Sequence, residues 1–368
     1  MRATRVPRGG KVWRRGSALA ASAVLVASLA ACGGSGGSAT SSSAAPESSA
    51  ADSSAAPEPT SAAPGETPEV RVITVTPTNI GTWDPVQRKA YDEAAAAGGW
   101  NLQVAEAVPY GEADQVLDQW GAEGVDVVFS TDNGYEQNLL AAAKKYPDTA
   151  WVMMSALSTT EDLPNVASYS FDWCQYGYLL GAIAGVVTND KTVGAVGSID
   201  IIPMTLSLAA EQAGAEAVNP GTQVISKNSG DFIDAQKGQA VAAGLVADGA
   251  DVLTAPVHGG ISPQIAAEAQ KNGVYYVGSF ADEAPSAPES VVSSVFVNFL
   301  GSYSEAVDTW MNGTFDPSIN ILGVADGVID STPLGLGFED KQATIDGVKQ
   351  QLANNEVVWP EGPCKPTS

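Results

Sequence analysis

The chain has 368 residues, with 42 acidic against 18 basic side chains and a formal net charge of −24 at pH 7. Such an acidic surface argues against nucleic acid and anionic lipid as partners, because both carry negative charge. The sequence has one histidine, three cysteines and no C-x-x-C spacing, which argues against a zinc site. We therefore expect no cofactor and no metal.

The first 31 residues have the pattern of a secretory signal peptide. Six basic residues precede an apolar run, residues 16–31, that is too short for a stable membrane span. The run ends in Leu29-Ala30-Ala31-Cys32, which resembles the lipobox of bacterial lipoproteins, so we predict that Cys32 carries lipid. The alternative is an ordinary signal peptide and a chance cysteine. Removal of residues 1–31 would leave 12 basic against 42 acidic residues, a net charge of −30.

Residues 32–68 are predicted to be a disordered linker behind the lipidated cysteine. Beyond Cys32 they are almost all Ser, Ala, Gly, Pro and Glu, with no aromatic or large aliphatic side chain before Val70. Such a composition cannot offset the entropy of ordering by burial. The folded part then begins near Glu69 and has about 300 residues, enough for two α/β lobes.

From residue 70 onward, strand-like and helix-like segments alternate. In chain order the patterns predict strand 70–75, helix 84–98, strand 102–107, helix 111–122, strand 124–129, helix 135–146, strand 150–154, helix 176–187, strand 192–196, helix 204–219, strand 222–227, helix 234–248, strand 251–255, helix 262–271 and strand 274–277. Helix 176–187 has Gly177, Gly181 and Gly185 at four-residue spacing. We interpret this spacing as close packing in a soluble domain rather than a membrane dimer face, because the segment is short.

The alternation predicts an α/β fold with parallel sheets covered by helices on both faces. It runs twice, so we expect two doubly wound lobes. In such sheets, ligands bind outside the carboxyl ends of the strands. This rule points to the loops that follow Val75, Phe129, Phe171, Lys227, Ala255 and Val277.

The sequence offers little for catalysis. A Ser/His/Asp triad would have to use His258, the only histidine. No nucleophile elbow lies at a strand-to-helix turn, and the folded part has neither a P-loop nor G-x-G-x-x-G. We expect no enzyme, and catalysis by carboxylates alone in a secreted hydrolase is the alternative.

The predicted loops do contain aromatic rings mixed with small polar groups. This mixture suits a flat ligand with polar edges, because rings stack on its faces while amides and carboxylates bind its edges. The alternative for any one of these residues is a loop position without a ligand. The candidates are Trp83, Asp84, Gln87, Asp132, Asn133, Tyr135, Asp231, Phe232, His258, Gly259, Phe280 and Asp282.

At these residues the chain resembles the basic membrane protein (BMP) family of substrate-binding lipoproteins, which take purine nucleosides or related bases. The resemblance covers nearly all of residues 70–358. Its motifs are Ala143-Lys144-Lys145-Tyr146-Pro147-Asp148, Asn165-Val166-Ala167 followed by Tyr178-Leu179-Leu180-Gly181-Ala182-Ile183-Ala184-Gly185, Gly230-Asp231-Phe232-Ile233-Asp234, and Gly249-Ala250-Asp251-Val252. They are similar to the family's A-K-K-Y-P-D, N-V-A…Y-L-A-G-x-x-A-G, S-F-x-D and G-A-D-V segments.

The resemblance implies a type I periplasmic-binding-protein fold, in which two lobes close on the solute by a hinge motion and deliver it to an ABC permease. It also implies that Trp83 and Gln87 supply the aromatic and amide of the first loop, that Phe232 stacks on the ligand, and that the glycine-rich ligand loop falls near His258 and Gly259. We therefore predict that Trp83 and Phe232 face one another across the cleft and sandwich a planar ligand.

Two positions depart from the family pattern. Phe280 replaces the first aspartate of the family's G-x-D-x-D segment, while Asp282 matches the second. The lysine often found in the S-V-x-K strand is missing near Val297 and Asn298. A buried site for ribose needs partners for its hydroxyls. The departures therefore favour a free base or another flat solute over a nucleoside.

The whole pattern predicts an extracytoplasmic solute-binding lipoprotein of an ABC importer, monomeric and held to the membrane only by lipid. The ligand would be a purine-type base or nucleoside, or a related flat solute. The alternative is a sensor for a sugar or signalling molecule. Lobe 1 is predicted as residues 69–172 plus 284–315, and lobe 2 as residues 173–283 plus 316–368.

The two remaining cysteines, Cys174 and Cys364, are predicted to form a disulfide. Both would lie outside the cytoplasm, where disulfides persist. The segment Glu361-Gly362-Pro363-Cys364 has no hydrophobic pattern to hold it, so a bridge would prevent fraying. The alternative is a pair of unpaired thiols.

Overall fold

The computed structural model describes residues 67–256 and 260–365. The predicted signal peptide, the lipidation of Cys32 and the disordered linker up to residue 66 lie outside these ranges, as do His258 and Gly259. None of the described helices is both long and apolar enough to cross a membrane.

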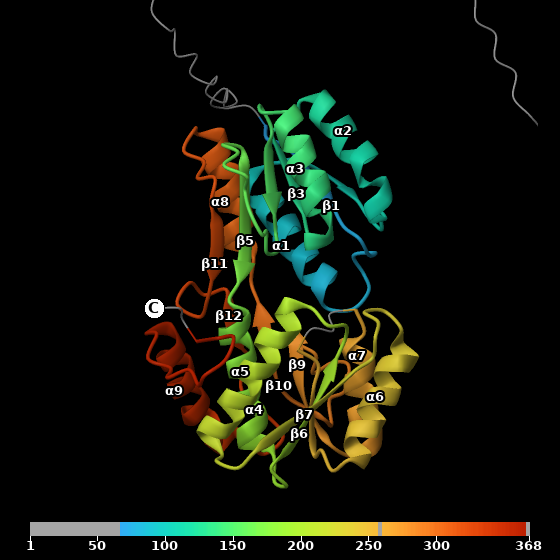
Figure 1. The fold of residues 1–368 in the computed structure, drawn as a ribbon, viewed down its shortest axis with the longest axis vertical. Coiled ribbons are helices and arrows are strands. Elements are labelled where there is room, and N and C mark those ends of the chain that lie inside the picture. The colour runs from blue at the N-terminus through green and yellow to red at the C-terminus, as the bar shows by residue number, and fades with distance from the viewer. Residues whose placement is uncertain (1–66, 257–259, 366–368) are drawn as a thin grey trace, which may run out of the picture. The chain divides into compact units, whose positions relative to one another are not determined.

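The first lobe is built on a six-stranded parallel sheet with the strand order β11-β5-β4-β3-β1-β2. Helices α1 and α8 pack on one face and α2 and α3 on the other (Figure 1). The elements are β1 (Glu69–Ile73), α1 (Trp83–Gly98), β2 (Asn101–Ala105), η1 (Tyr110–Glu112), α2 (Ala113–Glu123), β3 (Val127–Ser130), η2 (Asn133–Tyr135), α3 (Glu136–Lys145), β4 (Ala150–Met153), β5 (Val166–Phe171), α8 (Leu300–Met311) and β11 (Ile319–Leu322).

The second lobe has a sheet with the order β12-β10-β9-β8-β6-β7, parallel except for the edge strand β12. Helices α4 and α5 cover one face, and α6 and α7 the other. The elements are α4 (Trp173–Val187), β6 (Thr192–Gly197), α5 (Ile202–Val218), β7 (Gln223–Asn228), α6 (Ala235–Ala247), β8 (Val252–Thr254), α7 (Ser262–Asn272), β9 (Tyr275–Phe280), β10 (Val291–Val297), β12 (Ile329–Ser331), η3 (Glu339–Lys341) and α9 (Gln342–Ala353).

Strands buried on both faces explain the continuous apolar runs in the sequence. In β4, Trp151 and Met153 pack toward α2 and α3, whereas Ala150 and Val152 pack toward α1 and α8. All four side chains are fully buried. The predicted α/β class with two parallel sheets is therefore confirmed.

The glycines of α4 allow it to lie directly against α5. A Cβ atom on Gly181 would lie 2.0 Å from the carbonyl oxygen of Glu211, and one on Gly177 would lie 2.4 Å from that of Ser207. Only glycine fits at such distances. The glycine spacing thus serves helix packing within the second lobe.

The predicted lobe boundaries need correction at two places. Residues 284–315 were assigned to lobe 1, but β10 pairs with β9 in the second sheet. Residues 316–368 were assigned to lobe 2, but β11 pairs with β5 in the first, and Figure 1 shows α8 and β11 beside β5. After β9 the chain returns to the same sheet, where β10 lies between β9 and β12. Sequence patterns do not reveal which strand a new strand will pair with. The chain crosses between lobes near residues 172, 299 and 323.

The crossing segments are hydrogen-bonded to one another. The backbone N–H of Asp172 donates to the carbonyl oxygen of Leu322 (2.8 Å), and that of Asn298 to Val328 (2.8 Å). The Gln175 side chain accepts from the backbone N–H of Val324 (3.0 Å). The three crossings therefore form one connected hinge region.

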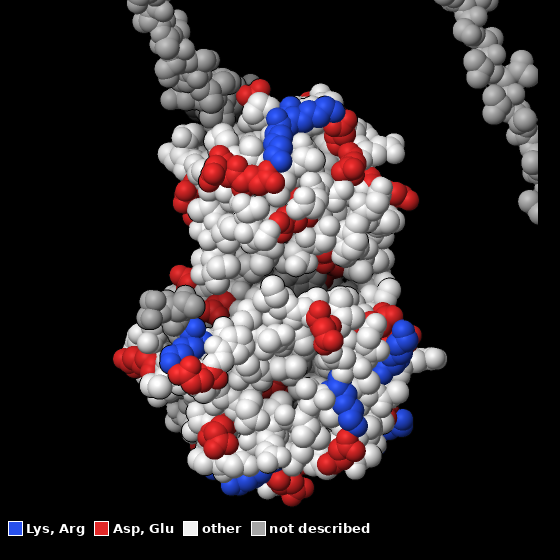
Figure 2. Space-filling model, in the orientation of Figure 1, with Lys and Arg blue, Asp and Glu red and all other residues white. Residues whose placement is uncertain are grey.

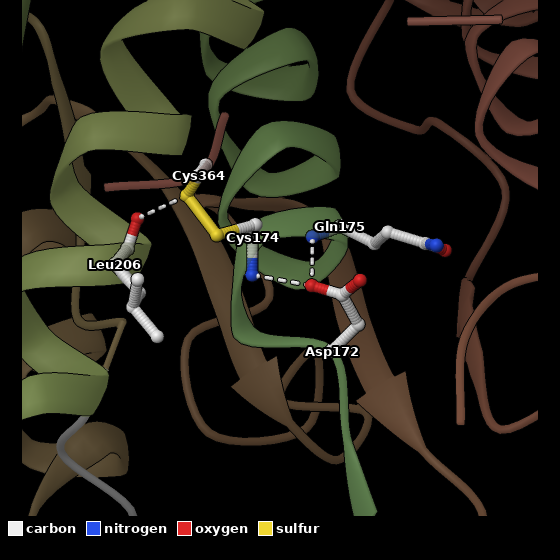
Figure 3. The surroundings of a disulfide bond; sticks show 5 residues. All are labelled: Asp172, Cys174, Gln175, Leu206 and Cys364. Carbon is white, nitrogen blue, oxygen red and sulfur yellow. Dashed lines mark hydrogen bonds between the residues drawn. A yellow bond between two sulfur atoms is a disulfide. The ribbon is translucent and has the colours of Figure 1, made fainter. Parts of the chain in front are cut away.

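The structure contains the predicted disulfide between Cys174 and Cys364, with Cα atoms 5.7 Å apart (Figure 3). Cys174 lies in the first turn of α4, where the Asp172 carboxylate caps the helix by accepting from the N–H groups of Cys174 (2.8 Å) and Gln175 (3.0 Å). The bond fastens the C-terminal segment beside the first crossing. Trp359 also holds this segment, through an edge contact with Tyr178.

A first prediction concerns the disulfide. It closes a loop with a sequence separation of 190 residues, which on the chain-entropy model stabilises the fold by more than about 4 kcal/mol. The Cys174→Ser/Cys364→Ser variant should lose about that much unfolding free energy in urea titrations. Unchanged stability, or two reactive thiols at these positions in the unfolded, unreduced protein, would show that the bond does not form.

Candidate ligand-binding site

The loops at the carboxyl ends of the two sheets meet around one tryptophan. Trp83, the first residue of α1 in lobe 1, contacts Phe280 at the end of β9 in lobe 2, with ring centroids 5.4 Å apart. Trp83 also contacts Phe299 (5.8 Å), at the second crossing, and Phe171 (6.2 Å), at the end of β5. The indole therefore lies where both lobes and two crossings converge.

The aromatic cluster continues into the second lobe. Phe280 and Tyr176 are stacked, with centroids 5.3 Å apart and planes 8° apart. Trp173 packs on Phe171 at 4.2 Å. We call these six residues the interlobe aromatic cluster: Trp83, Phe171, Trp173, Tyr176, Phe280 and Phe299. Aromatic pairs of this kind contribute about 0.5–1.5 kcal/mol each beyond their buried area.

Trp83 is held by a hydrogen bond as well as by packing. Its Nε1–H donates to the carbonyl oxygen of Thr131 (3.1 Å), in the loop after β3. Neighbouring Asp84 is buried and accepts from the hydroxyls of Thr131 (3.1 Å) and Thr76. Burial raises the pKa of Asp84 to about 6, although both hydroxyl hydrogen bonds oppose this shift. Asp84 thus ties together the loop after β1 and the loop after β3, next to Trp83.

Gln87 lies in the core of lobe 1, away from any open surface. It is fully buried, its Nε2 donates to Met154 O (3.1 Å), and its Oε1 accepts from Tyr303 OH (2.9 Å). Both ends of the amide are therefore occupied within the protein. In this structure Gln87 is a packing residue that joins α1, α8 and the end of β4.

Most polar side chains after β3 form hydrogen bonds with nearby protein groups. Asp132 accepts from the N–H of Gly134 (2.7 Å) and from the hydroxyl of Tyr110 (2.8 Å). Tyr135 is fully buried and donates to Val108 O. Asn133 is exposed. The loop therefore has a defined shape, with Asn133 as its accessible side chain.

In lobe 2, Phe232 is 38% exposed, and the ring contacts of the described residues do not include a Trp83–Phe232 pair. The predicted sandwich of these two rings remains a prediction. Asp231 accepts from the N–H groups of Ile233 (3.0 Å) and Asp234 (3.1 Å) and from Lys237 (3.0 Å). These bonds, the one from Ile233 first, lower its pKa to about 2.

Phe280 and Asp282 differ sharply in their surroundings. Phe280 is 2% exposed and has a φ of 67°, a left-handed conformation that is rare for a bulky side chain. Asp282 is exposed and accepts from the N–H of Ala284 (3.0 Å). Strand β9 extends three residues beyond the predicted end at Val277, so Phe280 closes the strand rather than lying in a free loop.

Four members of the interlobe aromatic cluster were absent from the sequence candidates: Phe171, Trp173, Tyr176 and Phe299. Phe171 was expected to end a strand that points toward the site, and the dense run Phe171-Asp172-Trp173-Cys174-Gln175-Tyr176 was a usable signal. Phe299 gave no such signal, because it belongs to the crossing that the predicted boundaries misplaced.

A cavity of about 430 Å³ lies beside the disulfide, lined by α4, α5 and the C-terminal segment. Its lining includes Leu206, Trp359 and Lys365, and also Asp172, which directly follows β5. No member of the interlobe aromatic cluster lines it. No group of three or more His, Cys, Asp or Glu among residues 67–256 and 260–365 could hold a metal ion.

The molecular surface gives a second view of the charge. On the face shown in Figure 2, acidic side chains are scattered over both lobes and the few basic ones lie beside them. Among the described residues, Lys145 forms an ion pair with Asp118, and Lys227 with Asp248. This face therefore offers no concentrated basic patch.

Two α/β lobes joined by three crossings, with aromatic rings where their loops meet, define a type I periplasmic-binding-protein fold. Residues 86–361 match the family described as "Bmp: ABC transporter substrate-binding protein PnrA-like". The chain belongs to this family of extracytoplasmic solute-binding proteins. The resemblance found in the sequence is thus confirmed.

Relatives and solved structures agree with this assignment. A protein of Haloferax volcanii, named as a candidate ABC transporter glucose-binding protein, is 26% identical over 74% of this chain and 68% of its own. A purine-binding protein of Brucella abortus is 22% identical over 69% of this chain and 71% of its own length. An ABC transporter solute-binding protein from Conexibacter woesei matches in structure with a TM-score of 0.69 and 26% identity, covering 80% of this chain and 99% of that one.

A second prediction follows from the buried Asp84. In the folded protein the Asp84 carboxyl stays protonated up to about pH 6, whereas in the unfolded chain it loses its proton near pH 3.8. The associated stability is therefore complete below about pH 4 and is lost as the pH rises through 6, by about 1.4 kcal/mol per pH unit. The side chain of Asp84→Asn does not titrate, so the variant does not lose this stability as the pH rises. Its unfolding free energy minus that of wild type should therefore increase by about 1.4 kcal/mol per pH unit between pH 4 and pH 6.

Urea titrations at pH 4, 5, 6 and 7 measure this difference. The control is Asp92→Asn, an exposed aspartate on the same helix. Parallel pH profiles for wild type and Asp84→Asn would contradict the assignment of a raised pKa.

Proposed function

We propose that the protein is a solute-binding lipoprotein of an ABC importer that takes a purine-type base, or a related flat solute, between its two lobes. The observation that carries this proposal is the position of Trp83, whose ring meets both lobes at the carboxyl ends of the sheets. Solutes of this fold class bind there and are enclosed by hinge motion. Membership in a family of substrate-binding proteins supports the transport role.

The chemistry around Trp83 favours a neutral, planar solute. Aromatic rings prefer to stack on flat ligands, and the interlobe aromatic cluster offers several. Phe280, which occupies a position where the family resemblance implies an aspartate for ribose, is apolar and buried. A base therefore suits this site better than a nucleoside. The purine-binding relative supports the purine class.

A sugar is the second candidate, because one relative is named for glucose binding. Sugars also pack against tryptophan, but they need several polar partners around the ring for their hydroxyls. A thermal-shift panel of purine bases, nucleosides and sugars separates the candidates, since a bound ligand stabilises the folded state by mass action. A gain in melting temperature with sugars alone would overturn the purine assignment.

A third prediction concerns the stacking residues. Trp83→Ala and Phe232→Ala should each weaken base binding at least tenfold, because each ring contributes about 1 kcal/mol beyond its buried area. Calorimetric titration measures the change. Trp100→Ala is the matched control, since this half-buried tryptophan lies just beyond the far end of α1. Wild-type affinity in Phe232→Ala would remove that ring from the site.

A fourth prediction concerns attachment to the membrane. We propose that Cys32 carries lipid and tethers the folded part to the outer face of the membrane. Cys32→Ser should release the protein into the medium or periplasm, as measured by fractionation of expressing cells. If the variant sediments with membranes as completely as wild type, the lipoprotein assignment is wrong.

A further inference from the structure

The turn that follows β9 is closed by a buried glutamate. Glu283 is 1% exposed, and its Oε2 accepts from the backbone N–H of Ser279 (2.7 Å), four residues earlier in the chain. The same oxygen accepts from the hydroxyl of Ser262 (2.5 Å), the first residue of α7. One carboxylate thus joins the end of β9 to the start of α7.

The backbone of Glu283 is anchored as well. Its N–H donates to the hydroxyl of Ser294 (3.0 Å) in β10. Gly278 leaves room for this bond, because a Cβ at that position would lie 2.2 Å from the Ser294 Oγ and 3.1 Å from the Glu283 Cβ. A larger residue there would push the serine hydroxyl away. We call the four hydrogen-bonded residues the β9 clamp: Ser262, Ser279, Glu283 and Ser294.

The β9 clamp begins where part of the sheet pairing ends. Strand β9 pairs with β8 as far as Val277 and with β10 as far as Phe280. Beyond Val277, the backbone N–H of Ser279 donates to the Glu283 carboxylate. Buried backbone N–H groups need such an acceptor. The carboxylate therefore completes the hydrogen bonding of the last residues of β9.

The residue next to this bond has an unusual backbone. Phe280 directly follows Ser279 and has a φ of 67°, a left-handed conformation that a bulky residue keeps only where its surroundings enforce it. The Ser279 N–H is fixed by Glu283, and the Phe280 ring stacks on Tyr176 with planes 8° apart. Phe280 is therefore held at its backbone by the β9 clamp and at its ring by α4.

The position of Phe280 in turn determines how the interlobe aromatic cluster is assembled. Its ring contacts Trp83 and Phe171 of lobe 1, with centroids 5.4 and 6.2 Å away. It also contacts Trp173 and Tyr176 of lobe 2, at 6.1 and 5.3 Å. A displacement of the β9 turn would therefore change the surroundings of Trp83.

We propose that Glu283 is a positioning residue for the solute: by closing the β9 turn, it keeps the Phe280 ring beside Trp83. The inference rests on the proposed function. At Phe280 the family resemblance implies an aspartate for ribose hydroxyls, so a ring held there disfavours a nucleoside. Glu283 acts on this preference through Phe280, without touching the solute.

The chemistry of the clamp explains why an acid is needed. A carboxyl oxygen can accept two hydrogen bonds, and the Glu283 Oε2 accepts from Ser262 and Ser279 at once. Without this side chain the Ser279 N–H would be buried with no acceptor, which is costly. The turn would then move to find another partner, and Phe280 would move with it.

The first test follows Trp83 without any ligand. The difference in near-ultraviolet circular dichroism between a protein and its Trp83→Phe version isolates the Trp83 signal, which depends on neighbouring rings such as Phe280. We expect Glu283→Ala to lose most of this signal. Glu283→Gln should retain it, because glutamine keeps an oxygen in the accepting position. An unchanged Trp83 signal in folded Glu283→Ala would overturn the inference.

Two further variants complete this test. Glu268→Ala is the matched control, since this buried glutamate of α7 pairs with Lys271 and Asn272 instead, and it should keep the Trp83 signal. Ser262→Ala removes one donor and leaves the acid in place, so it should change the signal in the same direction as Glu283→Ala but by less. If Glu283→Ala does not fold, Ser262→Ala decides, and an unchanged signal there overturns the inference.

The second test measures the solute preference by equilibrium dialysis with guanine and guanosine. Measurements at pH 8 keep Glu283 ionised, since burial raises its pKa to about 7. We expect wild type and Glu283→Gln to bind guanine at least about tenfold more tightly than guanosine, because ribose hydroxyls would meet an apolar ring. Glu283→Ala should lose most of that preference.

The outcomes separate this inference from the proposed function. If wild type binds neither compound, the proposed function fails, while the Trp83 signal still decides whether Glu283 positions Phe280. If wild type binds guanosine as tightly as guanine, Phe280 does not disfavour ribose and the inference is overturned. It is also overturned if Glu283→Ala keeps the full preference for guanine.

Discussion

The contact between Trp83 and Phe280 is the constraint on which the rest of the site depends. It joins the first residue of α1 in one lobe to the last residue of β9 in the other. Trp83 is fixed by its hydrogen bond to Thr131 and by buried Asp84 behind it. Phe280 is fixed by its stack on Tyr176. Trp83 is itself partly exposed, so the indole that joins the lobes is also open to a solute.

The hinge region lies beside this contact. Three crossings are tied together by backbone and side-chain hydrogen bonds, and the disulfide fastens the C-terminal segment beside the first of them. The aromatic contacts at the lobe junction lie close to these crossings, because Phe171 and Phe299 flank two of them. The rings at the site therefore lie directly beside the segments that join the two lobes.

The sequence predicts the α/β class, most helices and strands, and the position of Trp83 near the carboxyl end of the first strand. It does so because periodicity and loop position report local structure. The lobe boundaries do not, since β10 and β11 each join a sheet through contacts distant in the chain. Gln87 was expected at the ligand, yet Tyr303 and Met154, far from it in sequence, draw its amide into the core. Glu211 and Glu283 resemble ordinary surface acids in the sequence, and only packing reveals that both are buried.

The most direct test of this account is a crystal structure of the protein with guanine bound. The account predicts that the base lies against the Trp83 indole, where the loops at the carboxyl ends of the two sheets meet. A bound base that makes no contact with Trp83 would contradict it.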